Sequence, residues 1–191
     1  MRVACCLLLF VLCPYLQAAE PRLTRVDDHV YRGRQPTKEE YGELARQGIK
    51  TVLDLRGGMI HKPHERKLVE AAGMQYVSIR LSGIFAPRDE QIARILAVLE
   101  DPAREPVFVH CRRGDDRLGL VIACYRIAHD HWSNQQALDE ACHLGLSRFE
   151  LLMRHYIRHF DPVRALASTP RDAERARHTT KKAPSLQRIS S

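Results

Sequence analysis

A cysteine and an arginine stand on either side of a short loop that a strand should enter and a helix should leave. The segment reads His110-Cys111-Arg112-Arg113-Gly114-Asp115-Asp116-Arg117-Leu118-Gly119. A loop that ends at a helix N-terminus offers backbone N–H groups and the positive end of the helix dipole to an anion, and an arginine fork binds two oxygens of a phosphate group. The same positive surroundings favour the thiolate of Cys111, which is a nucleophile. The pattern therefore predicts hydrolysis of a phosphate ester through a phosphocysteine intermediate, with no metal and no cofactor.

The elements that must hold this loop follow from apolar periodicity and from glycine and proline positions. Strands are expected near residues 29–33, 50–56, 74–80 and 106–110, and the last of these is apolar throughout, as a buried parallel strand should be. Helices are expected over residues 37–48, 63–72, from 87 to about 99, 118–129, 135–144 and 148–160. This alternation predicts a single α/β domain with a central, mainly parallel sheet flanked by helices, and it places a ligand beyond the carboxyl ends of the strands.

The two ends of the chain differ from its middle in composition. Residues 1–19 combine one arginine, an apolar run and small residues before Glu20, which predicts a secretory signal peptide and hence a periplasmic or secreted protein. Of the net charge of +7, most lies in residues 164–191, which hold seven basic and two acidic residues. We therefore expect a phosphatase-like domain over residues 20–163 and a flexible basic tail over residues 164–191.

Charge and cysteine content limit the other functions. Residues 20–163 are nearly balanced in charge, so no specific nucleic-acid partner is expected, and the tail alone is a candidate for weak contact with anionic surfaces. Three of the six cysteines lie before residue 20, which leaves Cys111, Cys124 and Cys142. Cys124 and Cys142 are interpreted as buried thiols, with a disulfide between them as the alternative in an oxidising compartment. We expect a monomer.

At residues 110–117 the chain resembles the cysteine-based protein tyrosine and dual-specificity phosphatase superfamily, whose signature is His-Cys-x5-Arg. Further segments, near residues 31–36, 48–56 and 123–126, resemble its small atypical bacterial and plant or fungal branch. The resemblance implies a phosphatase-like fold, Cys111 as the nucleophile, Arg117 as the phosphate-binding arginine and His110 as a residue that sets the acidity of the cysteine. It places Arg112, Arg113, Gly114 and Asp115 around the substrate phosphate, although Arg112 and Arg113 also fit ordinary solvated charges and Asp115 an exposed one.

The chain departs from this family at two positions. Leu118 stands where the family commonly has a serine or threonine that assists departure of the cysteine thiolate, so turnover of the phosphoenzyme is expected to be slow. The loop of residues 81–87 lacks the usual aspartate that acts as general acid. Two replacements compete: Asp116, whose alternative role is an ion pair with an arginine, and Asp89, whose alternative role is to cap a helix.

The resulting hypothesis is an exported phosphate-monoester hydrolase acting on a phosphorylated protein or a small phosphate ester. A phosphoinositide or inositol phosphate phosphatase is the nearest alternative. The second class of function is a phosphate-ester-binding module with weak or no turnover, which Leu118 and the missing loop acid would explain. A sulfur-transfer domain is the third, but it would not need Arg117 at this spacing.

Overall fold

The computed structural model describes residues 23–57 and 62–168. The expected signal peptide and residues 169–191 of the expected tail lie outside the described residues. No helix within the described ranges has the length and apolar character needed to cross a membrane.

A five-stranded sheet lies at the centre of the domain, in the order β1-β2-β5-β3-β4. The strands are β1 (Thr24–Arg25), β2 (Val30–Gly33), β3 (Thr51–Asp54), β4 (Gln75–Ser78) and β5 (Val107–His110). Only β1 is antiparallel to its neighbour, and β5 pairs in parallel with both β2 and β3. The prediction of a single α/β domain with a mainly parallel sheet is confirmed.

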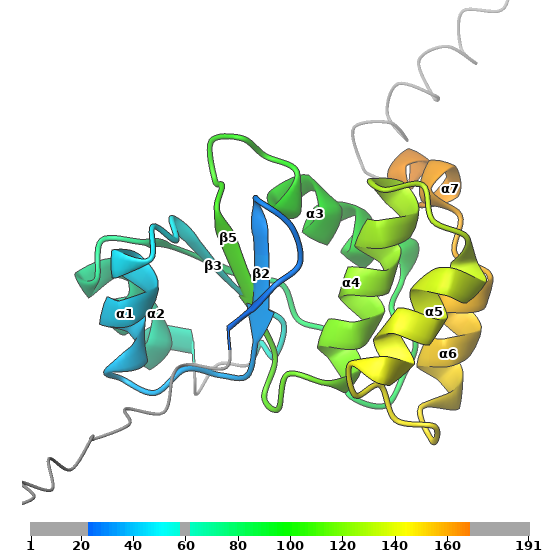
Figure 1. Ribbon diagram of the computed structural model, residues 1–191, viewed down its shortest axis with the longest axis horizontal. Helices are drawn as coiled ribbons and strands as arrows, with labels where there is room; N and C mark the ends of the chain where they lie inside the picture. The colour runs from blue at the N-terminus through cyan, green and yellow to red at the C-terminus, as the bar shows by residue number, and fades with distance from the viewer. Residues whose placement is uncertain (1–22, 58–61, 169–191) are drawn as a thin grey trace, which may run out of the picture.

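Helices cover both faces of the sheet (Figure 1). Two lie on one face: α1 (Glu40–Arg46) and α2 (Lys62–Ala71). Five lie on the other: α3 (Asp89–Leu99), α4 (Asp116–Ala128), α5 (Asn134–His143), α6 (Leu151–Arg158) and α7 (Pro162–Ala167). The alternation of strand side chains divides the core, because Phe108 packs toward α1 and α2 while Val107 and Val109 belong to the larger cluster on the α4 side.

β5 and α4 carry the segment of chemical interest. All four residues of β5 are buried, and so are ten of the thirteen residues of α4, which packs under α3, α5 and α6. A helix buried on nearly all sides is fixed in position by its neighbours. The loop between β5 and α4 is therefore held at both ends by rigid elements.

Apart from shifts of a few residues at the ends of strands and helices, two elements and the expected domain boundary at residue 163 differ from the expectations. The short β1 and the helix α7 carry no strong periodicity and were not expected. α7 crosses the expected boundary at residue 163, because Asp161 accepts hydrogen bonds from the N–H groups of Val163 and Arg164 and Pro162 occupies the first turn. Residues 164–167 thus belong to the folded domain. Cys124 and Cys142 are both free thiols, so the alternative disulfide is not formed.

Candidate active site

The catalytic loop, residues 111–116, follows β5 at the carboxyl edge of the sheet. Cys111 is buried, and its Sγ accepts a hydrogen bond of 3.3 Å from the N–H of Gly114. Gly114 has a φ of 87°, and a Cβ there would lie 2.8 Å from the backbone nitrogen of Arg34. Only glycine fits this position, because the backbone of Gly33 and Arg34 leaves no room for a Cβ. This glycine lets the loop turn around the sulfur of Cys111.

Cys111 and Arg117 line one cavity of about 730 Å³, hereafter the catalytic cavity. Its lining residues are Gly83, Cys111, Arg112, Arg113, Asp115, Asp116, Arg117 and Glu150. Within the described part of the chain no hydrogen bond or ion pair engages the guanidinium of Arg117. A thiol and an uncommitted arginine fork therefore face the same space, as the sequence predicts for a phosphate site.

Arg113 and the two aspartates of the loop form a separate cluster. The guanidinium of Arg113 donates to Asp115 Oδ2 at 2.9 Å and to Asp116 Oδ2 at 2.8 Å. These contacts raise the pKa of Arg113, through the hydrogen bond and charge of Asp115 first and of Asp116 second. The ion pair considered for Asp116 is thus formed with Arg113, and Asp115 is half-buried rather than exposed. Arg112 and Arg113 were both candidates for ordinary solvated charges, and of these two only Arg112 is one.

Asp116 is held on both sides. While Oδ2 meets Arg113, Oδ1 accepts a hydrogen bond of 3.0 Å from the N–H of Ser147 in the loop before α6. Asp116 lines the catalytic cavity and is 9% exposed. The structure thus places this acid candidate beside Cys111 and Arg117 with a fixed orientation.

Asp89, the other acid candidate, lies at the start of α3 and is absent from the catalytic cavity lining. Its carboxylate accepts hydrogen bonds from Tyr156 Oη at 2.7 Å and from Arg164 Nε at 2.8 Å. Burial alone would raise the pKa of Asp89, but these two hydrogen bonds and the charge of Arg164 outweigh it and lower the pKa. An ionised Asp89 that accepts these hydrogen bonds connects α3 to α6 and α7. It is poorly suited to hold a proton for a leaving group.

His110 is completely buried at the end of β5 and connects the catalytic loop to α2. Its Nδ1 lies 3.2 Å from the carbonyl oxygen of Cys111, and its Nε2 lies 2.9 Å from Oε1 of Glu65 without the alignment of a hydrogen bond. Glu65 also accepts a hydrogen bond of 2.6 Å from Tyr41 Oη and contacts Arg56. The imidazole of His110 thus lies between the backbone carbonyl of Cys111 and a buried carboxylate.

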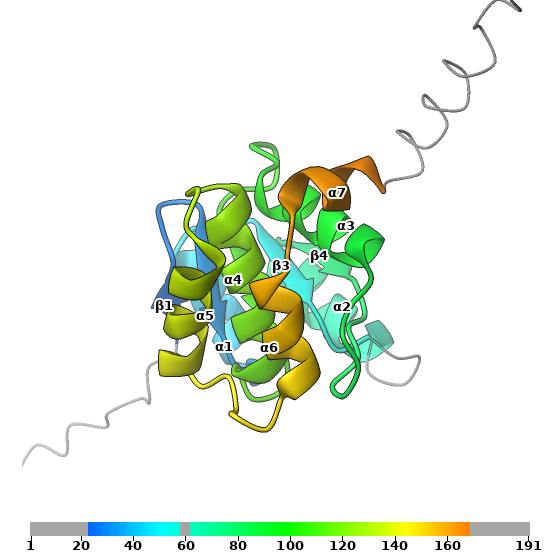
Figure 2. The ribbon, with the colours of Figure 1, turned by 90° about the vertical axis from the view of Figure 1, so that its right-hand side faces the viewer.

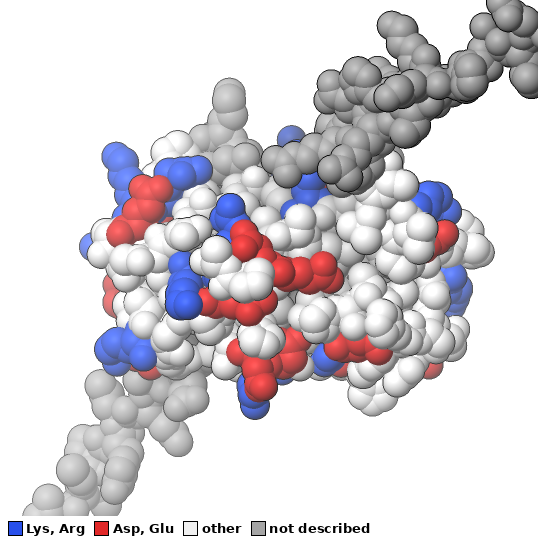
Figure 3. Space-filling view, turned by 90° about the horizontal axis from the view of Figure 1, so that it is seen from above, with Lys and Arg blue, Asp and Glu red and all other residues white. Residues whose placement is uncertain are grey.

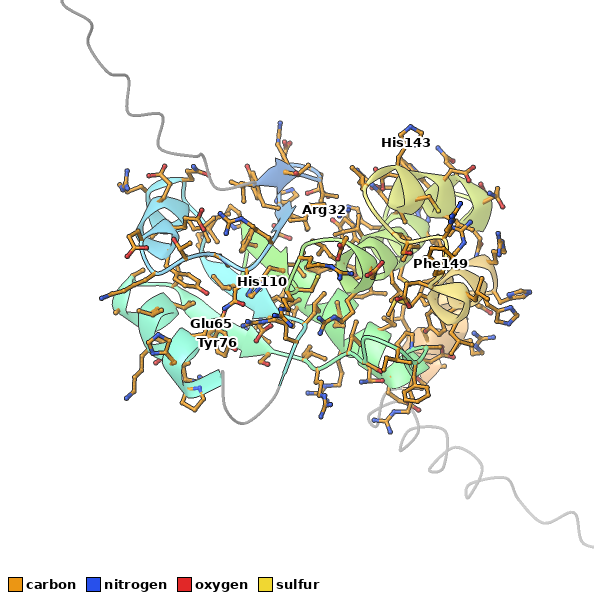
Figure 4. The ribbon with its side chains drawn as sticks, turned by 90° about the horizontal axis from the view of Figure 1, so that it is seen from below. Arg32, Glu65, Tyr76, His110, His143 and Phe149 are labelled. Carbon is orange, nitrogen blue, oxygen red and sulfur yellow. The ribbon has the colours of Figure 1, made fainter. Side chains whose placement is uncertain are left out.

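Asp54, Glu65 and His110 present ligand-type atoms within 4.8 Å of one another. Glu65 and His110 are labelled in Figure 4. Arg56 fills the space between the carboxylates, because its guanidinium donates to Asp54 Oδ1 at 2.8 Å and also reaches Glu65. Tyr76 Oη adds a hydrogen bond of 3.0 Å to Asp54. The carboxylate oxygens are thus satisfied by protein donors, and this cluster is best described as the buried support of the catalytic loop.

Three residues of this site were not predicted from the sequence. Arg32 on β2 is 4% exposed and donates to the carbonyl of Gly114 at 2.9 Å, with burial lowering its pKa. Glu65 supports His110 from α2, and Glu150 lines the catalytic cavity from the loop before α6. For Arg32 a signal was present, since it belongs to one of the segments that resemble the phosphatase superfamily. Glu65 and Glu150 lie in ordinary amphipathic contexts and carry no local signal.

Leu118 is fully buried in the core cluster of α4. Its side chain packs among apolar residues and offers no hydroxyl at the position after Arg117. The departure noted in the sequence therefore has a structural counterpart, because the residue after Arg117 is an apolar core residue of α4.

Comparison with known proteins agrees with this geometry. A family described as "DSP-PTPase phosphatase fused to NAD+ Kinase" matches residues 16–158. The dual specificity protein phosphatase TpbA of Pseudomonas aeruginosa is 31% identical over 134 residues, which are 69% of this chain and 59% of TpbA. The inositol diphosphatase SIW14 of Saccharomyces cerevisiae is 25% identical over 144 residues, 72% of this chain and 50% of SIW14. The chain thus spans little more than half the length of these curated relatives.

Solved structures give the same result. The crystal structure of P. aeruginosa TpbA superimposes with a TM-score of 0.64 at 26% identity, covering 75% of this chain and 88% of that one. The catalytic domain of SIW14 shares the fold, with a TM-score of 0.66 over 85% of this chain and 94% of that one. The family match covers most of the chain and contains residues 110–117 in full. The chain therefore belongs to the cysteine-based dual-specificity phosphatase superfamily.

Proposed function

We propose that the protein hydrolyses phosphate monoesters through a covalent phosphocysteine on Cys111. The observation that carries this proposal is that Cys111 and an uncommitted Arg117 line the same cavity. The thiolate attacks phosphorus, the P–O bond to the ester oxygen breaks, and that oxygen leaves with a proton from an acid. Water then attacks the phosphocysteine and releases phosphate and the thiolate. Arg117 and the loop N–H groups bind the phosphoryl oxygens in both steps.

We propose Asp116 as the acid that protonates the leaving oxygen. It lines the cavity, whereas the Asp89 carboxylate is engaged by Tyr156 and Arg164. Arg113 must then turn from Asp116 to the substrate phosphate, so that Asp116 can hold a proton. Arg113 is well suited to this movement because its side chain is 70% exposed.

The test is the Cys111→Ser variant with an aryl phosphate ester. We expect hydrolysis to disappear while inorganic phosphate or tungstate still binds, because the loop N–H groups and Arg117 remain in place. Residual turnover within about tenfold of wild type would show that Cys111 is not the nucleophile. A wild-type protein that releases one equivalent of alcohol and then stalls would support the binding-module alternative, for which the buried Leu118 provides the structural reason.

For the substrate we propose a phosphoprotein or a small phosphate monoester before an inositol diphosphate. TpbA has been crystallised with phosphotyrosine, whereas SIW14 is an inositol diphosphatase. The catalytic cavity is lined by three arginines and three carboxylates, a balance that suits one phosphate group better than several. A panel of phosphopeptides, phosphoinositides and inositol phosphates at equal concentration tests this, and a preference for the most highly charged inositol phosphate would reverse it.

We further propose that the enzyme is exported and is periplasmic or secreted, on the strength of residues 1–19. N-terminal sequencing of the protein recovered from its cells should begin at Ala19 or Glu20, and a sequence that begins at Met1 would contradict export.

A further inference from the structure

The mouth of the catalytic cavity carries most of the exposed apolar surface of the described domain. Large apolar side chains that are exposed include Ile84 (71%), Phe85 (67%), Phe149 (76%) and Leu151 (70%). Their chain neighbours Gly83 and Glu150 line the catalytic cavity, so the two pairs stand on its two sides. Leu152 and Leu144 belong to the same region, which leaves only Val163 and Leu166 elsewhere among the exposed large hydrophobic residues of the described ranges. Such a concentration is typical of an interaction surface.

Ile84, Phe85 and Phe149 sit on loops that point the same way, and Leu151 begins α6 directly after the second loop. The loop between β4 and α3 and the loop between α5 and α6 reach the lower edge of the molecule in Figure 2. Ser82 Oγ accepts hydrogen bonds from the N–H groups of Ile84 and Phe85, at 3.1 and 3.0 Å, and Ser147 Oγ accepts one from Phe149 at 3.2 Å. The tips are thus presented by turns of defined shape.

Three exposed arginines belong to the segments that carry or adjoin these apolar side chains. Arg80, Arg112 and Arg148 are exposed and have no acidic partner within the described residues, and the guanidinium of Arg148 lies 4.8 Å from the centre of the Phe149 ring. The nearby aspartates of the catalytic loop are already neutralised by Arg113. The opposite face carries basic and acidic side chains side by side (Figure 3). Glu150 is a cavity-lining carboxylate without an ion-pair partner within the described residues, and the three free arginines outnumber it. The catalytic face is therefore both apolar and basic on balance.

The shape of this surface distinguishes between partners. A peptide that binds by apolar side chains needs a groove with apolar walls. The catalytic cavity is lined mainly by charged residues, and the exposed tips project singly on either side of it. Protruding apolar side chains beside arginines fit a bilayer interface, where the former enter the acyl boundary and the latter bind lipid phosphates.

We propose that the catalytic face docks on an anionic phospholipid bilayer, with Ile84, Phe85, Phe149 and Leu151 in its interfacial region. The catalytic cavity then opens onto phosphate esters carried by lipids. Their role as substrates rests on the proposed hydrolase function.

The test is sedimentation of the proposed mature protein, which begins at Ala19 or Glu20, with phosphatidylcholine vesicles that contain or lack phosphatidylglycerol. We expect binding to the anionic vesicles, and we expect the double variant Phe85→Ser, Phe149→Ser to bind at least about tenfold more weakly, since each side chain buries a large apolar area. The matched control is Val163→Ser on α7, which is 75% exposed but lies away from the cavity, and it should bind as wild type does. Any contribution of residues 169–191 is common to all three proteins.

Hydrolysis of a soluble aryl phosphate by the same proteins separates this proposal from the proposed function. The double variant should keep that rate while its rate on phosphatidic acid in anionic vesicles falls at least about tenfold. Wild type that fails to sediment, or a double variant that sediments as wild type does, overturns the docking. A double variant that loses rate on phosphopeptides and keeps vesicle binding assigns the surface to a protein partner and also overturns it. Failure of wild type on every ester would refute the hydrolase and leave the sedimentation result intact.

Discussion

Arg113 of the catalytic loop and Arg117 in the first turn of α4 differ in what their guanidinium groups contact. Arg113 is neutralised by Asp115 and Asp116, whereas Arg117 has no ion-pair partner in the described part of the chain. A bidentate fork that is not already satisfied gains most from a phosphate dianion. The absence of a competing carboxylate therefore supports the proposal that Arg117 binds the substrate phosphate.

Replacement of Arg117 by lysine should lower kcat/KM for an aryl phosphate by about 10²–10³, because an ammonium group cannot reproduce two parallel hydrogen bonds to the transition state. Arg112→Lys is the matched control, since Arg112 lines the same cavity but is exposed, and it should change the rate by less than about threefold. Steady-state kinetics of the two variants decides the assignment. Equal losses would mean that the phosphate lies elsewhere in the loop.

The general acid is tested by the dependence of rate on the pKa of the leaving alcohol. Asp116→Asn should slow esters of poor leaving groups by about 10²–10⁴ and hardly affect activated aryl esters, since only the former need the proton. Asp89→Asn should leave that dependence unchanged and cost about 1 kcal/mol of stability through its contacts with Tyr156 and Arg164. A steeper dependence in Asp89→Asn, with a uniform loss in Asp116→Asn, would exchange the two roles.

At the scale of elements, the catalytic loop depends on a buried polar cluster that joins β3, α2 and β5. Asp54 at the end of β3 binds Arg56, and Arg56 contacts Glu65, which in turn lies against His110. Removal of one member leaves buried charges without a partner, and this is far more costly than the loss of a surface ion pair. The cluster thus couples the position of α2 to the position of the cysteine.

The pH dependence of stability should show this coupling. Burial alone would raise the pKa of Asp54, but hydrogen bonds from Arg56 and the charges of His110 and Arg56 outweigh it, so the pKa lies below its usual value. Such a carboxyl favours the folded state fully above its unfolded pKa of about 3.9, and this contribution is lost as the pH falls through the lower folded pKa.

Asp54→Asn should therefore be less stable than wild type by about 3 kcal/mol near pH 7, with a gap that narrows below about pH 4. Urea unfolding of both proteins at several pH values measures it. Asp101→Asn is the control, because both side chains of its pair with Arg104 are partly exposed, Arg104 at 34% and Asp101 at 36%, and the pair should contribute less than about 1 kcal/mol. A gap that stays constant down to acid pH would show that the Asp54 carboxylate is not stabilised by folding.

The elements that the sequence predicted correctly are those with local signals. β5 is an uninterrupted apolar run, and α1 ends before Gly48, whose φ of 87° stops it. The helix expected from Thr37 begins only at Glu40, although Thr37 N–H does donate to the Glu40 carboxylate at 2.7 Å. The buried supports were out of reach for a different reason. Arg32 and Gly114 are 82 residues apart, and no local pattern reports a contact made by the packing of β2 beside β5.

At the scale of the whole molecule, side-chain contacts between residues far apart in the sequence hold together the layer of helices on the α4 side. Ser147 before α6 binds Asp116, and Arg164 in α7 binds Asp89 at the start of α3. α7 therefore closes the layer over α3, and Ala165 is fully buried against it. A domain boundary placed at residue 163 from composition would separate α7 from the domain. The composition misleads here because the basic residues of the tail begin at Arg164, which lies within α7.

A chain that ends at residue 163 should consequently be less stable than one that ends at residue 168. The shorter chain loses the partly exposed Arg164–Asp89 pair and the burial of Ala165, which together amount to about 1–2 kcal/mol. Urea unfolding of the two chains measures the difference, and Arg164→Ala in the longer chain isolates the ion pair, for which we expect less than about 1 kcal/mol. The rate on a soluble aryl phosphate should be unchanged below the unfolding transition, because α7 contributes no residue to the catalytic cavity lining. Equal unfolding midpoints would show that α7 adds nothing to the domain, whereas a loss of rate in the stable chain would show that the α3–α7 contact reaches the catalytic loop.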